Sequence, residues 1–253
     1  MSSFVSNIKI THVLVAINII VYILTVAFSF FFWGNTNMFS SDTRTLYIFG
    51  AEHLPSILSG QVWRLVLPAF LHGSLIHLAL NMYVLFGLGE AIELFYGRRK
   101  LLAVYVLSAF FGSIASVVVS LVGAFSTGGA TTVYPISVGA SGAVFGLIGL
   151  LLGNSYKNDD YNPRIPVNIS GLWFFVIINL MFGFGFNVVG SGFSINNAAH
   201  IGGLLSGIVL GLLFSTKNNF YQGKISKIIE SFLVAFSVVL VIFSIVLHIF
   251  FFN

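Results

Sequence analysis

Seven long apolar stretches, separated by shorter polar connections, dominate the hydrophobic pattern of this 253-residue chain. A helix needs about 20 apolar residues to cross the hydrocarbon of a bilayer, whereas strands of membrane barrels are shorter and alternate in polarity. The stretches cover residues 10–33, 72–95, 101–124, 138–153, 169–187, 198–215 and 228–252. They are continuous rather than alternating, so the pattern predicts an all-α, polytopic membrane helical bundle.

The first and fourth stretches carry further information. Stretch 10–33 is too long for a secretory signal peptide and lacks a small-residue cleavage site, so we interpret it as a retained membrane anchor. Stretch 138–153 is shorter than a full crossing. We therefore expect it to be buried at the centre of the bundle and to begin below the membrane surface.

The composition supports a membrane protein and narrows its chemistry. Hydrophobic residues make up 57% of the chain and charged residues only 7%, with a mean hydropathy of +1.01. Soluble domains carry about 25% charged residues. The chain has no cysteine, which excludes disulfides, iron–sulfur clusters and thiol chemistry. It also has no His-Glu-x-x-His motif and no acidic residue in the middle of a span, which disfavours zinc and aspartyl intramembrane proteases. We expect no metal or cofactor.

The positive charges lie in alternate connections between the spans. Nine of the eleven Lys and Arg residues follow this pattern: Lys9, Arg98, Arg99, Lys100, Lys157, Arg164, Lys217, Lys224 and Lys227. Positive residues favour the cytoplasmic side, so the N-terminus is expected in the cytoplasm and, after seven spans, the C-terminus outside. The net charge of +4 therefore reflects topology and does not indicate a nucleic-acid partner. We expect an integral multi-pass protein of a bacterial plasma membrane, with no targeting extension.

Residues 34–71 form the longest connection, and we expect them to lie in the outer membrane interface. Trp63 and Arg64 are adjacent there, and an aromatic side chain beside a cation is a common interfacial anchor.

The segment Gly139-Ala140-Ser141-Gly142 begins the short fourth span. A serine at a helix start has free backbone N–H groups beside it, which can stabilise a developing negative charge. The two glycines allow a tight turn and the close approach of a substrate backbone. Gly146, Gly149 and Gly153 continue the small-residue pattern, so a helix-packing surface without chemistry remains an alternative.

His200 lies near the start of the sixth span, ahead of Gly203, Gly207 and Gly211 on one close-packed face. A neighbouring histidine is the usual base that activates a serine hydroxyl. The alternative is a histidine that makes an interhelical hydrogen bond or faces water. The topology places Ser141 and His200 on the outer side of the membrane, at similar depth. Because no carboxylate lies mid-span, a Ser-His dyad is favoured over a triad.

His77 and Asn81, four residues apart near the outer start of the second span, share one helix face. Both side chains carry N–H groups and suit an oxyanion site. The alternative is a polar pair that only stabilises helix contacts. We expect His72 to be interfacial and to have at most a supporting role.

These motifs, in this order, resemble the rhomboid intramembrane serine proteases. The Gly139-to-Gly142 segment matches the family's Gly-x-Ser-Gly motif, Ala199-His200 with Gly203 and Gly207 matches its histidine motif, and His77 with Asn81 matches its His-x-x-x-Asn. The stretches 60–64 and 70–72 resemble the family's entry into the second helix. The resemblance covers roughly residues 10–214. It implies a six-helix rhomboid-like core plus a C-terminal seventh transmembrane helix.

The resemblance implies a division of the chain and roles for its residues. Residues 1–9 would be a short cytoplasmic N-terminus, 10–215 the catalytic core, and 216–253 a cytoplasmic connection with the seventh helix. Ser141 would be the nucleophile and His200 its general base. The implied oxyanion donors are the Ser141 N–H, His77 and Asn81. The implied supporting residues are Gly139, Gly142, Phe145, Trp63 and Arg64, and Glu93 would have a structural role. Phe145 stands where the family often has a tyrosine that packs on the base.

The family's substrates are single-span membrane proteins, which it cleaves near the outer membrane–water boundary. The fifth span and the glycine-rich loop 183–192 would form the gate and cap. Two alternatives remain: an inactive relative that binds membrane proteins for quality control, and a small transporter or channel. We expect membrane lipids as partners, while the oligomeric state is left open.

Overall fold

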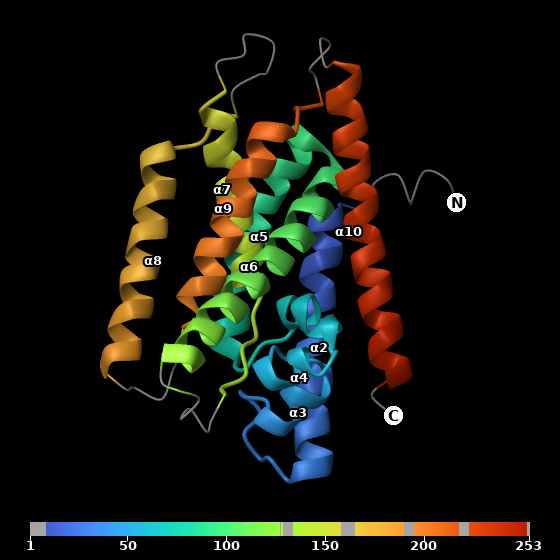
Figure 1. Ribbon diagram of the computed structural model, residues 1–253, viewed down its shortest axis with the longest axis vertical. Coiled ribbons are helices and arrows are strands. Elements are labelled where there is room, and N and C mark those ends of the chain that lie inside the picture. Colours follow the sequence, from blue (N-terminus) through green and yellow to red (C-terminus); the bar gives the residue numbers. More distant parts are fainter. Residues whose placement is uncertain are drawn as a thin grey trace.

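The computed structural model describes residues 9–126, 128, 134–157, 165–189, 195–217 and 223–251. Within these residues seven long helices run through a bundle, and each overlaps one of the predicted apolar stretches (Figure 1). They are α2 (Ile10–Trp33), α5 (Leu75–Tyr96), α6 (Arg98–Ser126), α7 (Ser141–Ser155), α8 (Ile169–Val189), α9 (Asn197–Leu213) and α10 (Lys224–Phe251). Within the described residues the regular elements are all helical, apart from two isolated β-bridges. The predicted all-α membrane bundle is confirmed.

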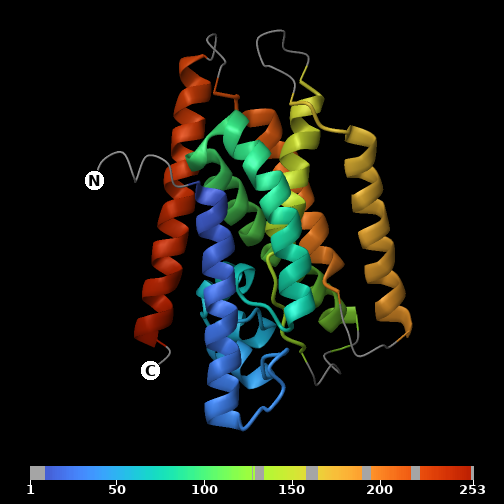
Figure 2. The same cartoon turned by 180° about the vertical axis from the view of Figure 1, so that it is seen from behind.

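Four of the described helices, α2, α5, α6 and α10, are long and apolar enough to cross a membrane by length and composition. The apolar helices α7 and α9 are shorter, and so is the part of α8 from Ile169 to Phe184. Between α2 and α5 lie the short helices α3 (Thr43–Ile48), α4 (Leu54–Leu58), η1 (Val62–Leu65) and η2 (Leu67–Phe70). Figures 1 and 2 show α3 and α4 gathered at the end of the bundle where α9 begins and α10 ends.

Several helix starts differ from the sequence prediction by one to four residues, and two of the differences have identifiable physical reasons. α5 begins at Leu75, where the hydroxyl of Ser74 caps the helix by accepting a hydrogen bond from the His77 N–H. His72 therefore lies in the preceding loop rather than in the helix. α7 begins at Ser141 rather than at residue 138, because Gly139 has a φ of +130°, which a right-handed helix cannot contain.

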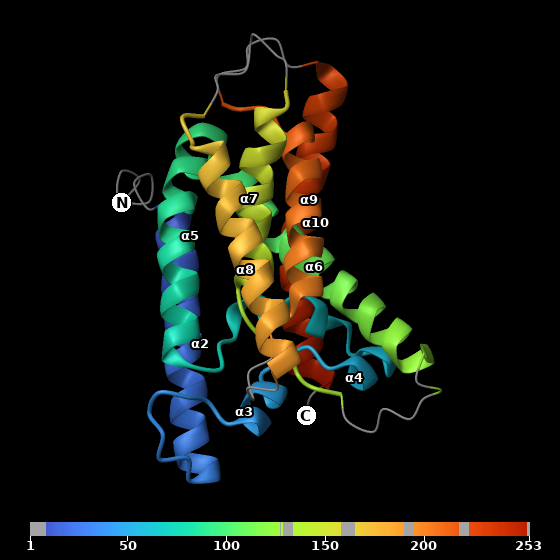
Figure 3. The ribbon, with the colours of Figure 1, turned by 90° about the vertical axis from the view of Figure 1, so that its left-hand side faces the viewer.

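The short helix α7 lies at the centre of the bundle. All its residues from Gly142 to Asn154 are buried. A helix that is apolar all round is stable only when other elements cover it, and α6 and α9 pack closely against α7 (Figure 3). The expected central burial of the fourth span is confirmed.

Glycines bring α7 and α9 into backbone contact. A Cβ on Gly203 would lie 2.1 Å from the carbonyl oxygen of Gly142, and one on Gly207 would lie 2.0 Å from that of Gly146. Helices approach this closely only where side chains are absent. The glycine face is thus a packing surface, and this surface brings the first turns of the two helices together.

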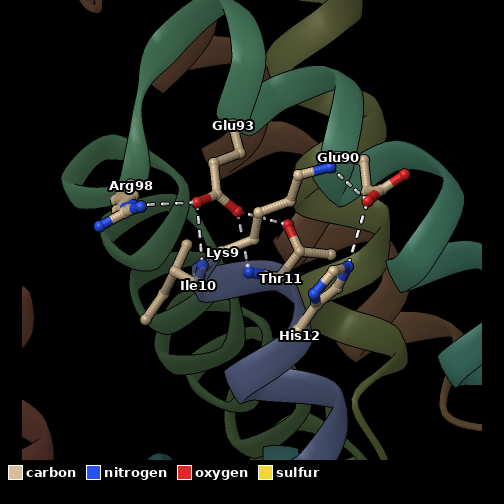
Figure 4. A network of polar contacts seen from close by, with 7 residues as sticks. All are labelled: Lys9, Ile10, Thr11, His12, Glu90, Glu93 and Arg98. Carbon is tan, nitrogen blue, oxygen red and sulfur yellow. Dashed lines mark hydrogen bonds and ion pairs between the residues drawn. The ribbon is translucent and has the colours of Figure 1, made fainter. Parts of the chain in front are cut away.

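At the end of the bundle opposite the first turns of α7 and α9, the carboxylate of Glu93 on α5 binds the first turn of α2 (Figure 4). It accepts hydrogen bonds from the N–H of Ile10 at 2.9 Å, and from the N–H of Thr11 at 3.0 Å and its hydroxyl at 2.8 Å. Arg98 lies 3.5 Å from the same carboxylate. Glu93 therefore satisfies N–H groups that a helix start leaves without partners.

Replacing Glu93 by Ala is expected to lower the free energy of unfolding by about 3 kcal/mol, because several buried donors lose their acceptor. Glu90 provides a matched control one turn away. It pairs with Lys9 and His12 on a solvent-exposed face, where such pairs contribute about 0–1 kcal/mol. Denaturation of the purified protein in detergent micelles measures both variants, and equal losses would contradict the capping role of Glu93.

The seventh long helix, α10, packs against α6 and η1. Near its start the buried carboxylate of Glu230 accepts a hydrogen bond from the Ser215 N–H and lies 2.7 Å from the Lys100 Nζ. Near its end the ring of His248 lies 6.1 Å from the ring of Trp63 on η1. α10 is thus attached to the bundle at both ends.

Candidate active site

The structure brings Ser141 and His200 into direct contact. The Oγ of Ser141, the first residue of α7, lies 2.8 Å from the Nε2 of His200 in the first turn of α9. His200 is only 7% exposed. A hydrogen bond at this distance allows the imidazole to take the serine proton when its Nε2 is unprotonated.

The imidazole of His200 is oriented by packing. Phe145, one turn after Ser141 on α7, stacks on it with ring centroids 4.3 Å apart and planes within 7°. The Nδ1 of His200 is buried and has no hydrogen-bond partner among the described residues. The catalytic dyad itself stays a prediction at this point.

Gly139 shapes the turn that leads into Ser141. Its φ of +130° is a conformation that other residues avoid, and its N–H donates to the carbonyl of Pro68 at 2.9 Å. A Cβ there would lie 2.6 Å from Cε1 of His77 and 3.7 Å from the Ser141 Oγ. The imidazole of His77 therefore lies against this turn, and only glycine leaves room for it.

Asn81 is buried one turn after His77 on α5. Its Nδ2 donates to the backbone carbonyl of His77 at 2.9 Å. A primary amide carries two hydrogens, so one donor remains for another acceptor. The expected oxyanion role of His77 and Asn81 stays a prediction.

The expectation that His72 is interfacial is wrong. The side chain is fully buried, and its Nε2 accepts a hydrogen bond from the Ala140 N–H at 3.4 Å. Its ring also contacts that of His77, with centroids 5.1 Å apart. His72 thus supports the turn immediately before Ser141, because the preceding loop folds back under α7.

Trp63 and Arg64 are buried too, so the interfacial anchor inferred from their pairing is wrong. The guanidinium of Arg64 donates to the carbonyls of Tyr47 at 2.9 Å and Ala51 at 2.7 Å, and to Gln61 Oε1 at 2.7 Å. A buried cation requires such partners. The bonds of Arg64 link parts of connection 34–71 from inside, and the loop-shaping role implied for Trp63 and Arg64 stays a prediction.

An apolar groove lies between α5 and α8, and the ribbons of both helices are seen in Figure 3. Its volume is about 630 Å³. The lining residues are Tyr83, Val84, Phe86, Gly87, Leu88, Ile148, Gly171, Leu172 and Phe175. Farther along, α8 contacts α9, where the Asn197 Nδ2 donates to the Leu180 carbonyl at 3.0 Å. Of the loop 183–192 expected to cap the site, residues 183–189 instead belong to α8, because the apolar helix continues through its glycines, and residues 190–192 lie outside the described residues.

Sequence reasoning missed Glu52, a buried carboxylate in the connection between α3 and α4. No motif marks it, and its importance becomes visible only in its hydrogen bond from Ser116 on α6, whose hydroxyl in turn accepts from Asn196 at the start of α9.

Fold and site define a polytopic helical membrane protein with a serine and a histidine in contact at its centre. Residues 59–217, more than half of the chain, match the Rhomboid domain family. The chain is therefore an integral membrane protein that belongs to the rhomboid family, and the resemblance drawn from its motifs is confirmed.

Three relatives illustrate the similarity. The Rhomboid protease GluP of Bacillus subtilis (strain 168) is 38% identical over 70% of this chain and 31% of its own length. Rhomboid-like protease 1 of Toxoplasma gondii is 34% identical over 68% of this chain and 53% of its own. RHOMBOID-like protein 5 of Arabidopsis thaliana is 32% identical over 67% and 49%. The matched region thus spans about a third to a half of these curated relatives.

Proposed function

We propose that this protein is an intramembrane serine endopeptidase in which Ser141 is the nucleophile and His200 the general base. The observation that carries the proposal is the 2.8 Å contact between Ser141 Oγ and His200 Nε2, in which the histidine is buried and the serine is half-buried. An ionisable group inside a membrane protein is costly to bury, which favours a functional reason for its presence.

The reaction would follow from this contact. His200 accepts the Ser141 proton as Oγ attacks the scissile carbonyl, and the imidazolium then returns the proton to the leaving amine. The negative oxygen of the tetrahedral intermediate would be stabilised by the Ser141 N–H at the start of α7, with His77 and Asn81 as further donors. Water then hydrolyses the acyl-enzyme with His200 again as base, so the dyad needs no metal or cofactor.

Single-span transmembrane proteins are the proposed substrates. The apolar groove between α5 and α8 offers a transmembrane segment a route from the lipid, and displacement of α8 would widen it. The positive charges of alternate connections favour a cytoplasmic N-terminus, an outer C-terminus, and cleavage near the outer boundary. A bacterial plasma membrane is the proposed location, while the matched relatives include eukaryotic proteins.

The alternatives account for fewer of the observations. A relative without proteolytic activity has no need for an aligned dyad, and both of its members are present here. A transporter requires polar side chains spread along the membrane depth, whereas Ser141, His200 and His77 occupy the first turns of their helices and Asn81 the second turn of α5.

Labelling of the detergent-purified protein with a fluorophosphonate tests the proposal. We expect wild type and Ser206→Ala to be labelled and Ser141→Ala to remain unlabelled. Ser206 is a matched control because its hydroxyl donates to the Gly203 carbonyl within α9, away from the dyad. A folded wild-type protein that stays unlabelled beside a reactive rhomboid would favour the inactive, binding relative. Labelling that survives in Ser141→Ala would identify another serine.

A further inference from the structure

We propose that Glu52 is a positioning residue that holds the first turn of α9, and with it the His200 imidazole, in place against Ser141. This inference rests on the proposed function, because it assigns Glu52 a part in aligning the dyad.

The backbone of Glu52 is tied to the segment that leads into Ser141. Glu52 N donates to the Ser137 carbonyl at 2.9 Å, and Ser137 N donates to the Glu52 carbonyl at 3.0 Å. The two hydrogen bonds join the connection between α3 and α4 to Ser137, four residues before Ser141. Glu52 is thereby attached to the nucleophile's side of the dyad.

The side chain of Glu52 reaches the histidine's side. It is 7% exposed, and its carboxylate accepts hydrogen bonds from the hydroxyls of Ser116 and Ser113 on α6. The Nδ2 of Asn196 donates to the Ser116 hydroxyl at 2.6 Å and to the Ser137 hydroxyl at 3.0 Å. Asn196 is the N-cap of α9.

Asn196 connects this network to the base. Its Oδ1 accepts from the Ala199 N–H at 3.0 Å, and its backbone carbonyl accepts from the His200 N–H at 3.2 Å. The Ser116 hydroxyl has a single proton, which it gives to Glu52, so its oxygen is left to accept from Asn196. Glu52 therefore sets which group donates and which accepts in these hydrogen bonds. The Asn196 NH2 group points to Ser116, and its side-chain oxygen points to the first turn of α9.

The burial of Glu52 is unfavourable by itself. Desolvation raises the pKa of its carboxyl to about 7, although the bonds from Ser116 and Ser113 oppose the shift. An apolar side chain would fill this position without that cost. The presence of a carboxylate instead of an apolar side chain is explained if its acceptor oxygen orders the hydrogen bonds around Asn196.

The test compares labelling rates of Glu52→Ala, Glu52→Gln, Asn196→Ala and the double variant Glu52→Ala/Asn196→Ala with wild type. Ser141→Ala reports independently on the proposed function. We expect Glu52→Ala to react about 10- to 100-fold more slowly, because small misplacements of reacting groups cost rates of this order. Glu52→Gln keeps the volume and an acceptor oxygen, so we expect it to restore the rate to within about threefold of wild type.

Coupling distinguishes positioning from general destabilisation. If Glu52 acts through Asn196, the double variant should react no more slowly than the slower single variant, because residues of one network are not additive. Asp42→Ala removes another carboxylate of the same connection, the N-cap of α3, and should label at the wild-type rate. If Glu52→Ala does not fold, Asn196→Ala and Glu52→Gln still test the link.

A wild-type rate in Glu52→Ala, a Glu52→Gln variant as slow as Glu52→Ala, or losses that multiply in the double variant would each overturn the inference. In all three cases wild-type labelling that disappears in Ser141→Ala would leave the proposed protease intact. An unlabelled wild type would overturn both.

Discussion

His200→Ala is expected to slow the reaction of Ser141 by about four to six orders of magnitude, close to the loss caused by Ser141→Ala. The reason is geometric. The Ser141 hydroxyl has one basic side chain in hydrogen-bond contact among the described residues, and that contact is the 2.8 Å bond to His200 Nε2. Without it, the hydroxyl keeps its proton and is a poor nucleophile.

Cleavage of a single-span substrate in liposomes measures this loss, with fluorophosphonate labelling as a second readout. Because the two residues act as a unit, the double variant should be no slower than either single variant. His12→Ala is the matched control, since this histidine pairs with Glu90 in the exposed network at the opposite end of the bundle. Substantial cleavage by His200→Ala would show that Ser141 is activated by another group, and the dyad would have to be abandoned.

The elements of the bundle were predictable because hydrophobic periodicity and length are properties of each segment alone. Stretch 10–33 coincides with α2 to the residue. The start of α7 was not predictable to the residue, since it depends on the positive φ of Gly139. That conformation is set by contacts with Pro68 and His77, which lie far away in the sequence.

The candidate site also has residues that were predictable from the sequence and residues that were not. Ser141, His200 and Gly203 lie in recognisable local motifs, and the glycine pattern also indicated which helix faces would meet. His72, Arg64 and Glu52 were misjudged or missed because their environments are created by the folding of connection 34–71. Adjacent Trp and Arg residues are compatible with a membrane surface or with a buried loop. Only the acceptor carbonyls of Tyr47 and Ala51 distinguish the two.

Gly207→Ala is expected to abolish labelling of Ser141 and to lower the free energy of unfolding by about 3 kcal/mol, the upper range for overpacking. The added Cβ would lie 2.0 Å from the carbonyl oxygen of Gly146 and 2.7 Å from its Cα. These are backbone atoms of a buried helix, which cannot turn aside as a flexible side chain does. α7 and α9 must therefore separate, and their first turns carry Ser141 and His200.

Gly123→Ala in α6 is the matched control, because a Cβ at that position meets no atom within 4 Å. Alanine is favoured over glycine in a helix by about 1 kcal/mol, so this variant should be as stable as wild type or more stable. Denaturation in micelles and the labelling rate, measured on the same preparations, provide the comparison.

If Gly207→Ala keeps both the stability and the rate of wild type, the glycine contact between α7 and α9 does not align the dyad. If it unfolds more easily but labels normally, the contact stabilises the bundle and the alignment of Ser141 with His200 depends on the connections at the start of α9.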